Sequence, residues 1–268
     1  MISLLSILAL TFTLEPAMVK QGQVALIKIS DAPSDLSVQM GNQKVALWDC
    51  EGAKRCGVIG VPLETPVGKI TAEMRSGREL QKLALGVERG DFKVNKLKVP
   101  AKITKPNAKE RAQIAQDKLD IEAAYKMGEK DPLWAERFEL PTGGIITSLF
   151  GNQRVYNGIL QSVHLGVDLR ANETTPIHVS NTGKVVLAKN LFMAGNLVLV
   201  DHGSGVYSSY AHLSRIDVQV GQSLKKGEQI GMAGATGRVT APHLHWSTKV
   251  NGIAVDPHAL IKVLSPRT

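Results

Sequence analysis

Short apolar runs separated by turn-forming residues fill the first hundred residues of the chain. Three of these runs, at residues 24–29, 45–48 and 69–74, are rich in β-branched or alternating apolar side chains. The turn signals are Gly41-Asn42, Gly57 and Ser76-Gly77. Short strands with turns at this spacing are typical of a β-sandwich. We therefore predict an Ig-like β-sandwich module over residues 17–100, with no visible chemistry of its own.

The residues that follow predict a helix. Asn107 can cap its first turn, Glu110 occupies the reciprocal capping-box position, and Gly128 follows its end. A partial apolar face is formed by Ile114, Leu119, Ile121 and Tyr125. We expect a helix over residues 107–127, within a helical linker at residues 101–136, and we expect its apolar face to pack against one of the two flanking domains.

The chain opens with the apolar run ISLLSILAL at residues 2–10. The length of this run suits the core of an export signal and is too short to span a bilayer. No Lys or Arg precedes the run, and no clean small-x-small cleavage site follows it. We interpret residues 1–16 as an imperfect signal segment. We therefore expect an exported protein, periplasmic or secreted, without a stable membrane span.

The composition is that of a globular protein. A length of 268 residues favours two domains, and 43% of the residues are hydrophobic while 21% are charged. The formal net charge of +8 favours an anionic partner or surface. Aromatic residues make up only 4% of the chain and no nucleic-acid-binding motif is present, so we expect no nucleic-acid partner. The lysines that gather at residues 93–109 are interpreted as a solvated linker face.

The chain contains two cysteines, Cys50 and Cys56, close together in the predicted sandwich. An even pair in an exported protein favours a disulfide that closes a small loop. Two free thiols are the alternative that the sequence leaves open.

The second half of the chain contains three histidine elements with metal-ligand chemistry. These are His164-Leu-Gly-Val-Asp168, Tyr210-Ala-His212 and His243-Leu-His245. A catalytic zinc ion typically keeps three imidazole or carboxylate ligands and one open position. A strand would present His243 and His245 on one face. His164 and Asp168 would converge if the chain turns near Gly166. The spacing alone leaves open which of the five side chains bind a metal.

Residues 140–257 closely resemble the lysostaphin-like, LytM-domain zinc endopeptidases, which cut peptide cross-links in bacterial peptidoglycan. The motifs that match in the family's order are TSLFG (147–151), HLGVD (164–168), GNLVLVDHG (195–203), YAHL (210–213), VGQ (220–222), GEQIG (227–231), GATG (234–237), PHLHW (242–246) and VDP (255–257). The resemblance implies a compact antiparallel β peptidase domain with a metal groove over residues 137–268. Ala241 stands where the family often has Gly, which leaves the ligand chemistry intact.

The resemblance also implies roles for the five side chains. One zinc ion would be bound by His164, Asp168 and His245. His212 and His243 would then be catalytic, because an attacking water needs its proton removed and the oxyanion needs stabilising. Which histidine performs which task stays open.

Other polar residues are weaker candidates for a role in the site. Tyr156 and Tyr210 are further candidate donors to the oxyanion. The remaining histidines, His178, His202 and His258, are interpreted as structural or exposed. Asp201 is interpreted as a turn residue rather than as support for a ligand.

The predicted function is zinc-dependent hydrolysis of peptide cross-links in peptidoglycan, with the D-alanyl to diaminopimelate bond favoured. The free carboxylates of peptidoglycan suit the positive charge of the chain. The alternative is a non-catalytic LytM-type regulator of cell-wall hydrolases, or a wall-binding protein. A zinc protease directed at other substrates would share the same chemistry. The five intact side chains favour an enzyme, and the sequence identifies no regulatory protein partner.

Overall fold

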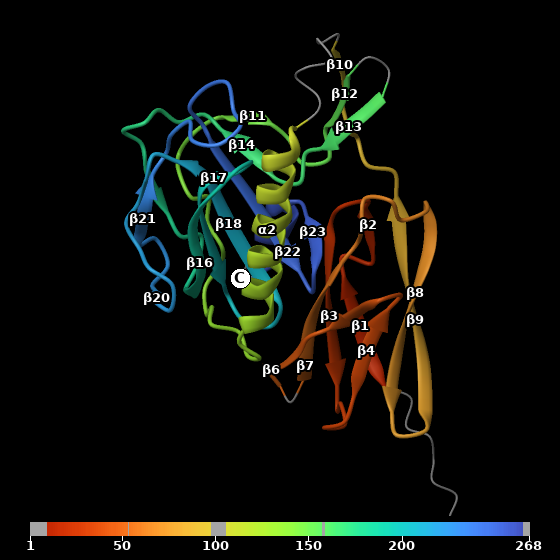
Figure 1. Cartoon of the computed structure of the whole chain (residues 1–268). Helices are drawn as coiled ribbons and strands as arrows, with labels where there is room; N and C mark the ends of the chain where they lie inside the picture. The colour runs from red at the N-terminus through yellow and green to blue at the C-terminus, as the bar shows by residue number, and fades with distance from the viewer. Residues whose placement is uncertain (1–9, 53, 98–105, 157–158, 265–268) are drawn as a thin grey trace, which may run out of the picture.

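The computed structural model describes residues 10–52, 54–97, 106–156 and 159–264. Within these residues the protein is mainly β, with an N-terminal β-sandwich, a C-terminal part built on a larger sheet, and two α-helices (Figure 1). Neither of these helices is long and apolar enough to cross a bilayer.

The N-terminal module is a sandwich of two sheets. One sheet has the order β1 (Thr11–Glu15), β3 (Val24–Ser30), β7 (Lys54–Gly60) and β6 (Leu47–Cys50). The other has the order β2 (Met18–Lys20), β9 (Glu79–Glu88), β8 (Gly68–Ser76), β4 (Ser37–Met40) and β5 (Gln43–Val45). Alternate residues of these strands turn inward, and Ile27, Val38, Met74 and Leu85 meet in the core between the sheets.

The predicted strands are present with two differences. The run at residues 45–48 is divided between β5 and β6 at Ala46, whose backbone N–H donates to the Asn251 side chain (3.1 Å) rather than to a neighbouring strand. The prediction of a turn at Gly57 is wrong, because Gly57 lies within β7. A Cβ atom at Gly57 would come within 2.8 Å of the Leu47 and Val45 side chains, so glycine permits close packing there and not a turn.

The sandwich begins earlier in the chain than residue 17. Strand β1 pairs with β3 from Thr11 to Glu15, so these residues, which we had assigned to a signal segment, belong to the first sheet. The apolar run up to residue 9 lies outside the described residues.

The predicted disulfide between Cys50 and Cys56 is present and joins β6 to β7. It closes the short hairpin at the end of the first sheet. A cross-link over so few residues constrains mainly the hairpin itself.

The C-terminal part is built on an eight-stranded sheet. Its strands, in order, are β11 (Ile146–Ser148), β14 (Val167–Leu169), β22 (Leu244–Val250), β18 (Val206–Leu213), β17 (Gly195–Asp201), β16 (Gly183–Leu191) and β20 (Ser223–Leu224), with β23 (Ile253–Val255) paired to β22. A smaller sheet contains β15 (Pro176–His178), β21 (Gln229–Met232) and β19 (Arg215–Ile216). The core between the two sheets contains Leu169, Ile177, Tyr210, Ile230 and Trp246.

Successive residues of strand β22 lie on opposite faces of the large sheet. Leu244, Trp246 and Val250 are fully buried, whereas His245 and Lys249 are partly exposed. Because successive residues of a strand point to opposite faces, burial of the apolar set directs the polar set toward the outer face.

The segment that joins the two parts supplies a strand to a sheet of the C-terminal part. Strand β10 (Val94–Leu97) pairs in parallel with β12 (Gln153–Tyr156), which pairs with β13 (Ile159–Val163). Part of the predicted sandwich range therefore completes a sheet of the C-terminal half. The lysines at residues 98–105 lie outside the described residues.

Helix α2 (Ala108–Ala124) confirms the predicted helix and ends in the 3₁₀ turn η1 (Tyr125–Met127). Both hydrogen bonds of the capping box between Asn107 and Glu110 are present. The helix covers the outer face of the large sheet, where Ile121 and Tyr125 pack near Tyr207 (Figure 1). The prediction for Leu119 is wrong, because its side chain is 58% exposed.

The two parts share an apolar interface. Val24 and Val58 of the sandwich cluster with Val206, Val250 and Val255 of the C-terminal part. The cluster also contains residues of helix α3 (Pro257–Val263), including Leu260. The Asn251 side chain donates to the Val58 carbonyl (2.8 Å). Because this contact combines apolar packing with a hydrogen bond, it holds the sandwich against the sheet.

A buried imidazole couples folding of the C-terminal part to pH. His202 is fully buried, and its Nδ1 and Nε2 lie 2.8 Å from the Thr182 carbonyl and 2.7 Å from the Ser208 hydroxyl. Burial lowers the pKa of His202 from its ordinary value of 6.5 to about 4. Between these two values the unfolded chain binds a proton that the folded chain excludes, so stability falls as the pH falls.

We expect the His202→Gln variant to show a weaker dependence of stability on pH than the wild type. Between pH 6.5 and pH 5 its free energy of unfolding should fall by about 2 kcal/mol less than that of the wild type. Urea denaturation at several pH values measures the difference. His178→Gln, which changes a partly exposed imidazole, is the control. Equal slopes for the wild type and His202→Gln would contradict the expectation.

Candidate metal centre

Three side chains from separate segments meet on the outer face of the large sheet. Asp168 lies on β14 and His245 on β22, and these residues are direct partners in the antiparallel register of the two strands. His164 lies in the turn between β13 and β14, as the predicted turn near Gly166 required. A Cβ atom at Gly166 would come within 2.8 Å of the His245 ring, so this glycine makes room for the imidazole.

The ligand atoms of these side chains form a small triangle. Nε2 of His164 lies 2.9 Å from Oδ1 of Asp168 and 3.0 Å from Nδ1 of His245. Nδ1 of His245 lies 2.8 Å from Oδ1 of Asp168. Two zinc ligands at about 2.0–2.1 Å from a tetrahedral ion are about 3.3 Å apart, so a triangle of this size is close to that required for a zinc ion.

The backbone sets the tautomer of His164. Its Nδ1 lies 2.9 Å from the Leu149 carbonyl oxygen, which only accepts hydrogen bonds. The proton of neutral His164 is therefore on Nδ1, and the lone pair of Nε2 points at the Asp168 carboxylate. Two groups that both accept hydrogen bonds face each other at this distance only when a cation or a proton lies between them. The donor set thus fits a metal ion.

The Asp168 carboxylate is held in its charged form. Burial alone would raise its pKa, but the adjacent imidazoles of His164 and His245 lower the pKa well below its usual range. Burial lowers the pKa of His245. A charged carboxylate beside a His245 imidazole that favours its neutral form is the protonation state that metal binding needs.

The two other histidines lie beside the triangle. The ring centroid of His212 is 4.9 Å from that of His243 and 6.0 Å from that of His245. Nε2 of His243 lies 3.7 Å from Oδ1 of Asp168. The structure therefore brings together all five of the side chains that the sequence singled out.

Backbone carbonyls also orient these two rings. Nδ1 of His212 donates to the Thr236 carbonyl (2.9 Å), and Nδ1 of His243 donates to that of Ala241 (2.9 Å). Nε2 of each neutral ring is then a proton acceptor. Burial lowers the pKa of His212 to about 4. The backbone of His212 has a positive φ of 64°, and its N–H donates to the Ala194 carbonyl (2.8 Å), which holds the residue in this rare conformation.

The tyrosine candidates do not join this cluster as far as the structure describes them. Tyr210 points to the opposite face of β18, where it is fully buried and its hydroxyl donates to Ser180 (2.9 Å). That prediction is wrong because alternation along β18 turns Tyr210 into the core. Tyr156 ends β12, and its side chain lies outside the described part of the chain.

The sequence reasoning missed two kinds of residue. The carbonyls of Leu149, Thr236 and Ala241 orient the imidazoles, and no sequence pattern identifies a carbonyl partner. It also missed Ser247 and Lys249, which follow His245 on the same face of β22. The period of two along the strand would have indicated them.

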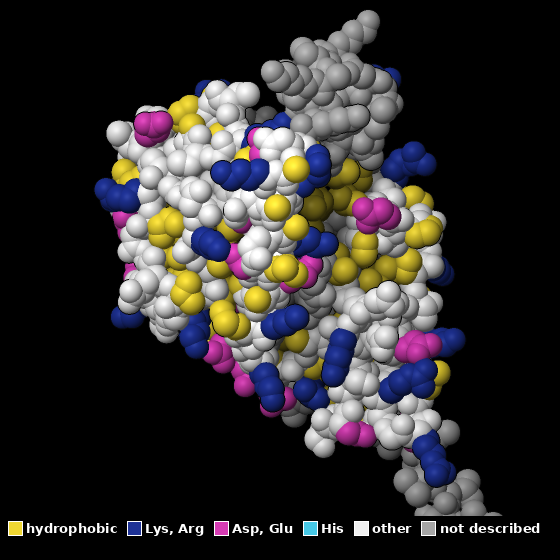
Figure 2. All heavy atoms as spheres, viewed as in Figure 1, with side chains coloured by type: hydrophobic (Ala, Val, Ile, Leu, Met, Phe, Trp, Pro, Cys, Tyr) yellow, Lys and Arg dark blue, Asp and Glu magenta, His cyan; other side chains and the backbone are white. Residues whose placement is uncertain are grey.

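Charge on the molecular surface is dispersed. Lys and Arg side chains are scattered over both parts of the face that Figure 2 shows, with Asp and Glu side chains among them. The positive net charge is therefore not gathered into one patch on this face.

The family model of peptidase family M23 matches residues 162–257, which include all five side chains. The peptidoglycan DD-endopeptidase ShyA of Vibrio cholerae serotype O1 is 37% identical over 122 residues, or 45% of this chain and 28% of that protein. The DD-carboxypeptidase/endopeptidase Mpg of Neisseria meningitidis serogroup B is 39% identical over 95 residues, or 35% of this chain and 22% of that protein. The chain thus spans about a quarter of the length of these curated relatives.

A solved structure resembles the chain over most of its length. The crystal structure of a candidate M23 peptidase from Pseudomonas aeruginosa is 28% identical and has a TM-score of 0.72. The match covers 91% of this chain and 95% of that chain. The shared fold therefore includes the N-terminal sandwich as well as the C-terminal sheet.

We expect the Asp168→Ala and His245→Ala variants to lose zinc, because each removes one corner of the triangle. Zinc content after dialysis, measured by plasma mass spectrometry, should fall from about one ion per chain to a small fraction. His212→Ala and His243→Ala should keep the ion, since neither residue belongs to the triangle. Full zinc content in both Asp168→Ala and His245→Ala would refute the ligand assignment.

Proposed function

We propose that this protein is a zinc endopeptidase that hydrolyses peptide cross-links of bacterial peptidoglycan, because residues 162–257 match the family model of peptidase family M23. The single observation that carries the proposal is the arrangement of the five side chains. Three of them form a metal-sized triangle, and two further imidazoles lie beside it with their Nδ1 protons held by the backbone.

We assign the metal to His164, Asp168 and His245. When bound there, zinc supplies a Lewis acid for the scissile carbonyl and lowers the pKa of water. The residues fix its position, because Asp168 and His245 are paired across two strands while the Leu149 carbonyl orients His164.

We assign proton transfer and stabilisation of the oxyanion to His212 and His243. Hydrolysis of an amide requires a group that removes a proton from water and a group that steadies the oxyanion. One neutral imidazole accepts the proton at Nε2, and the other, in its imidazolium form, donates a hydrogen bond to the oxyanion from Nε2. The proton taken from water can then be returned to the leaving amine. No covalent intermediate on the protein is needed, because water is the nucleophile.

The proposed substrate bond joins D-alanine to diaminopimelate. Support comes from the two curated relatives, both of which carry endopeptidase names, one of them for peptidoglycan. The net charge of +8 suits a wall polymer with free carboxylates. The same reasoning proposes a location in the cell envelope.

We expect the zinc-loaded wild type to convert cross-linked muropeptide dimers in purified sacculi to monomers, while His245→Ala does not. Mass spectrometry of the released fragments identifies the bond. Sacculi with diaminopimelate cross-links and sacculi with glycine bridges are compared side by side. Release of monomers from the former alone supports the proposed bond. Unchanged sacculi of both kinds would refute the enzyme and favour a non-catalytic regulator.

We expect His212→Gln and His243→Gln to bind zinc normally and to lose activity by about 100-fold or more, in line with the loss of general acid–base catalysis. The rate of dimer hydrolysis and the zinc content are measured on the same preparations. His178→Gln serves as the matched control. Full activity in either variant would exclude that imidazole from the reaction.

A further inference from the structure

The outer face of the sheet continues from the metal triangle along β22. His245, Ser247 and Lys249 lie on this face in succession, opposite Ala211, Ser209 and Tyr207 of β18. The hydroxyls of Ser209 and Ser247 are 2.6 Å apart. At about 3.3 Å per residue, Lys249 lies about 13 Å from His245 along the strand, which is the length of about four extended residues.

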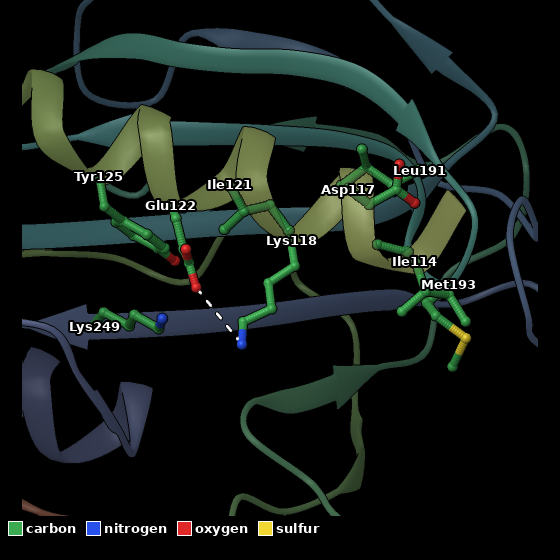
Figure 3. A pocket seen from close by; sticks show the side chains of 10 residues that line it. Ile114, Asp117, Lys118, Ile121, Glu122, Tyr125, Leu191, Met193 and Lys249 are labelled. Carbon is green, nitrogen blue, oxygen red and sulfur yellow. Dashed lines mark ion pairs between the residues drawn. The ribbon is translucent and has the colours of Figure 1, made fainter. Parts of the chain in front are cut away.

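A cavity of about 290 Å³ opens around Lys249. Its wall on one side is helix α2, including Ile114, Lys118 and Ile121, and the turn between β16 and β17 contributes Met193 and Ala194 (Figure 3). The Ala194 carbonyl also accepts the backbone N–H of His212. The same turn therefore borders both the cavity and the histidine cluster.

Lys249 brings a positive charge to this cavity without an ion pair. Its Nζ lies 4.3 Å from the centroid of the Tyr125 ring, and no carboxylate oxygen of the described residues comes within 4.0 Å of it. Glu122 instead pairs with Lys118 (3.7 Å), as the dashed line in Figure 3 shows. Burial lowers the pKa of Lys249 and the charge of Glu122 offsets this only in part, so the folded protein bears a cost for the Lys249 charge. An anion in the cavity would offset that cost.

The wall of the cavity is built in advance of any ligand. The buried Asp117 carboxylate accepts hydrogen bonds from the Phe192 backbone N–H (2.7 Å) and the Gln113 side chain (2.8 Å). The Tyr207 hydroxyl donates to the Tyr125 carbonyl (3.0 Å). The bond to Phe192 holds the middle of α2 and the bond from Tyr207 holds its C-terminal end against the sheet, and a preformed site loses less entropy on binding.

We propose that this cavity is a substrate subsite in which Lys249 binds a free carboxylate of the peptide stem, a few residues from the bond that is cut. The inference rests on the proposed function and adds that the enzyme selects stems with a free carboxylate. Lys118, at the mouth of the cavity, already pairs with Glu122, so Lys249 is the positive charge that the stem carboxylate meets. Ile114, Ile121 and Met193 contact the aliphatic part of the stem.

Lys249→Met tests the subsite, because methionine keeps most of the volume and the contact with Tyr125 but removes the charge. The substrates are cross-linked muropeptide dimers with free stem carboxylates and the same dimers with these groups converted to carboxamides. The wild type should prefer the acid dimer, and Lys249→Met should raise KM for it about tenfold with little change in kcat. Lys262→Met, an exposed lysine of α3, is the matched control.

The amide dimer separates a lost charge contact from general damage. Lys249→Met should cleave it as fast as the wild type does. Equal losses on both dimers, or no loss on either, would overturn the subsite. Thermal unfolding of the variant checks that the sheet and α2 remain folded, and the more conservative Lys249→Arg should restore most of the preference for the acid dimer.

A binding measurement distinguishes failure of the subsite from failure of the proposed function. Calorimetric titration of His245→Ala with the acid and amide forms of an uncross-linked stem peptide requires no hydrolysis. Tighter binding of the acid form, lost in the double variant with Lys249→Met, supports the subsite even if sacculi stay uncut. If the wild type hydrolyses sacculi but His245→Ala binds the two peptides with equal affinity, the subsite is overturned. The proposed endopeptidase activity is then still supported.

Discussion

The antiparallel register of β14, β22 and β18 is the constraint on which the site depends. It places Asp168 opposite His245, and His245 opposite Ala211 at the end of the strand that carries His212. Burial on the opposite face fixes this register, because Leu244 and Trp246 are fully buried there. A slip of one residue would bury His245 and expose Trp246, at a cost in both hydrophobic burial and polar desolvation. The apolar core therefore fixes the position of a polar cluster on the opposite face of the sheet.

Two loops, one after β11 and one between β21 and β22, complete the cluster through backbone carbonyls. Leu149, Thr236 and Ala241 each accept the Nδ1 proton of one imidazole. A carbonyl cannot ionise or change its role, so the tautomer of each ring is set by the fold rather than by the pH of the surroundings. This arrangement leaves the Nε2 atoms of His164, His212 and His243 free for chemistry. It also makes the conformation of the loops as important as the identity of the histidines.

The N-terminal half of the chain supports this site without supplying a member of the triangle. The sandwich is joined to the large sheet by a common apolar cluster, and β10 extends the hairpin that leads to His164. The chain then continues to α2, which packs on the same face of the sheet as the metal triangle. The helix thus closes one side of the cavity around Lys249. Residues far apart in sequence line one continuous face, from the triangle to α2.

Much of the local structure was determined by the sequence. The capping box at Asn107 and Glu110, the strands at residues 24–29 and 69–74, and the cysteine pair depend on interactions between near neighbours, and all appear as expected. The five side chains of the site were also identifiable, because their residue types and order carry the chemistry. Short-range rules suffice wherever the interacting groups lie within a few residues of each other.

Only the tertiary structure decided what depends on long-range packing. It turned Tyr210 inward, left Leu119 exposed and placed Gly57 within a strand, since burial on a given face depends on which element covers it. It also decided that α2 lies over Lys249 and leaves that charge without a carboxylate partner. The sequence specified the chemical groups. Their distances, tautomers and exposure followed from strand register and helix packing, which involve residues a hundred positions apart.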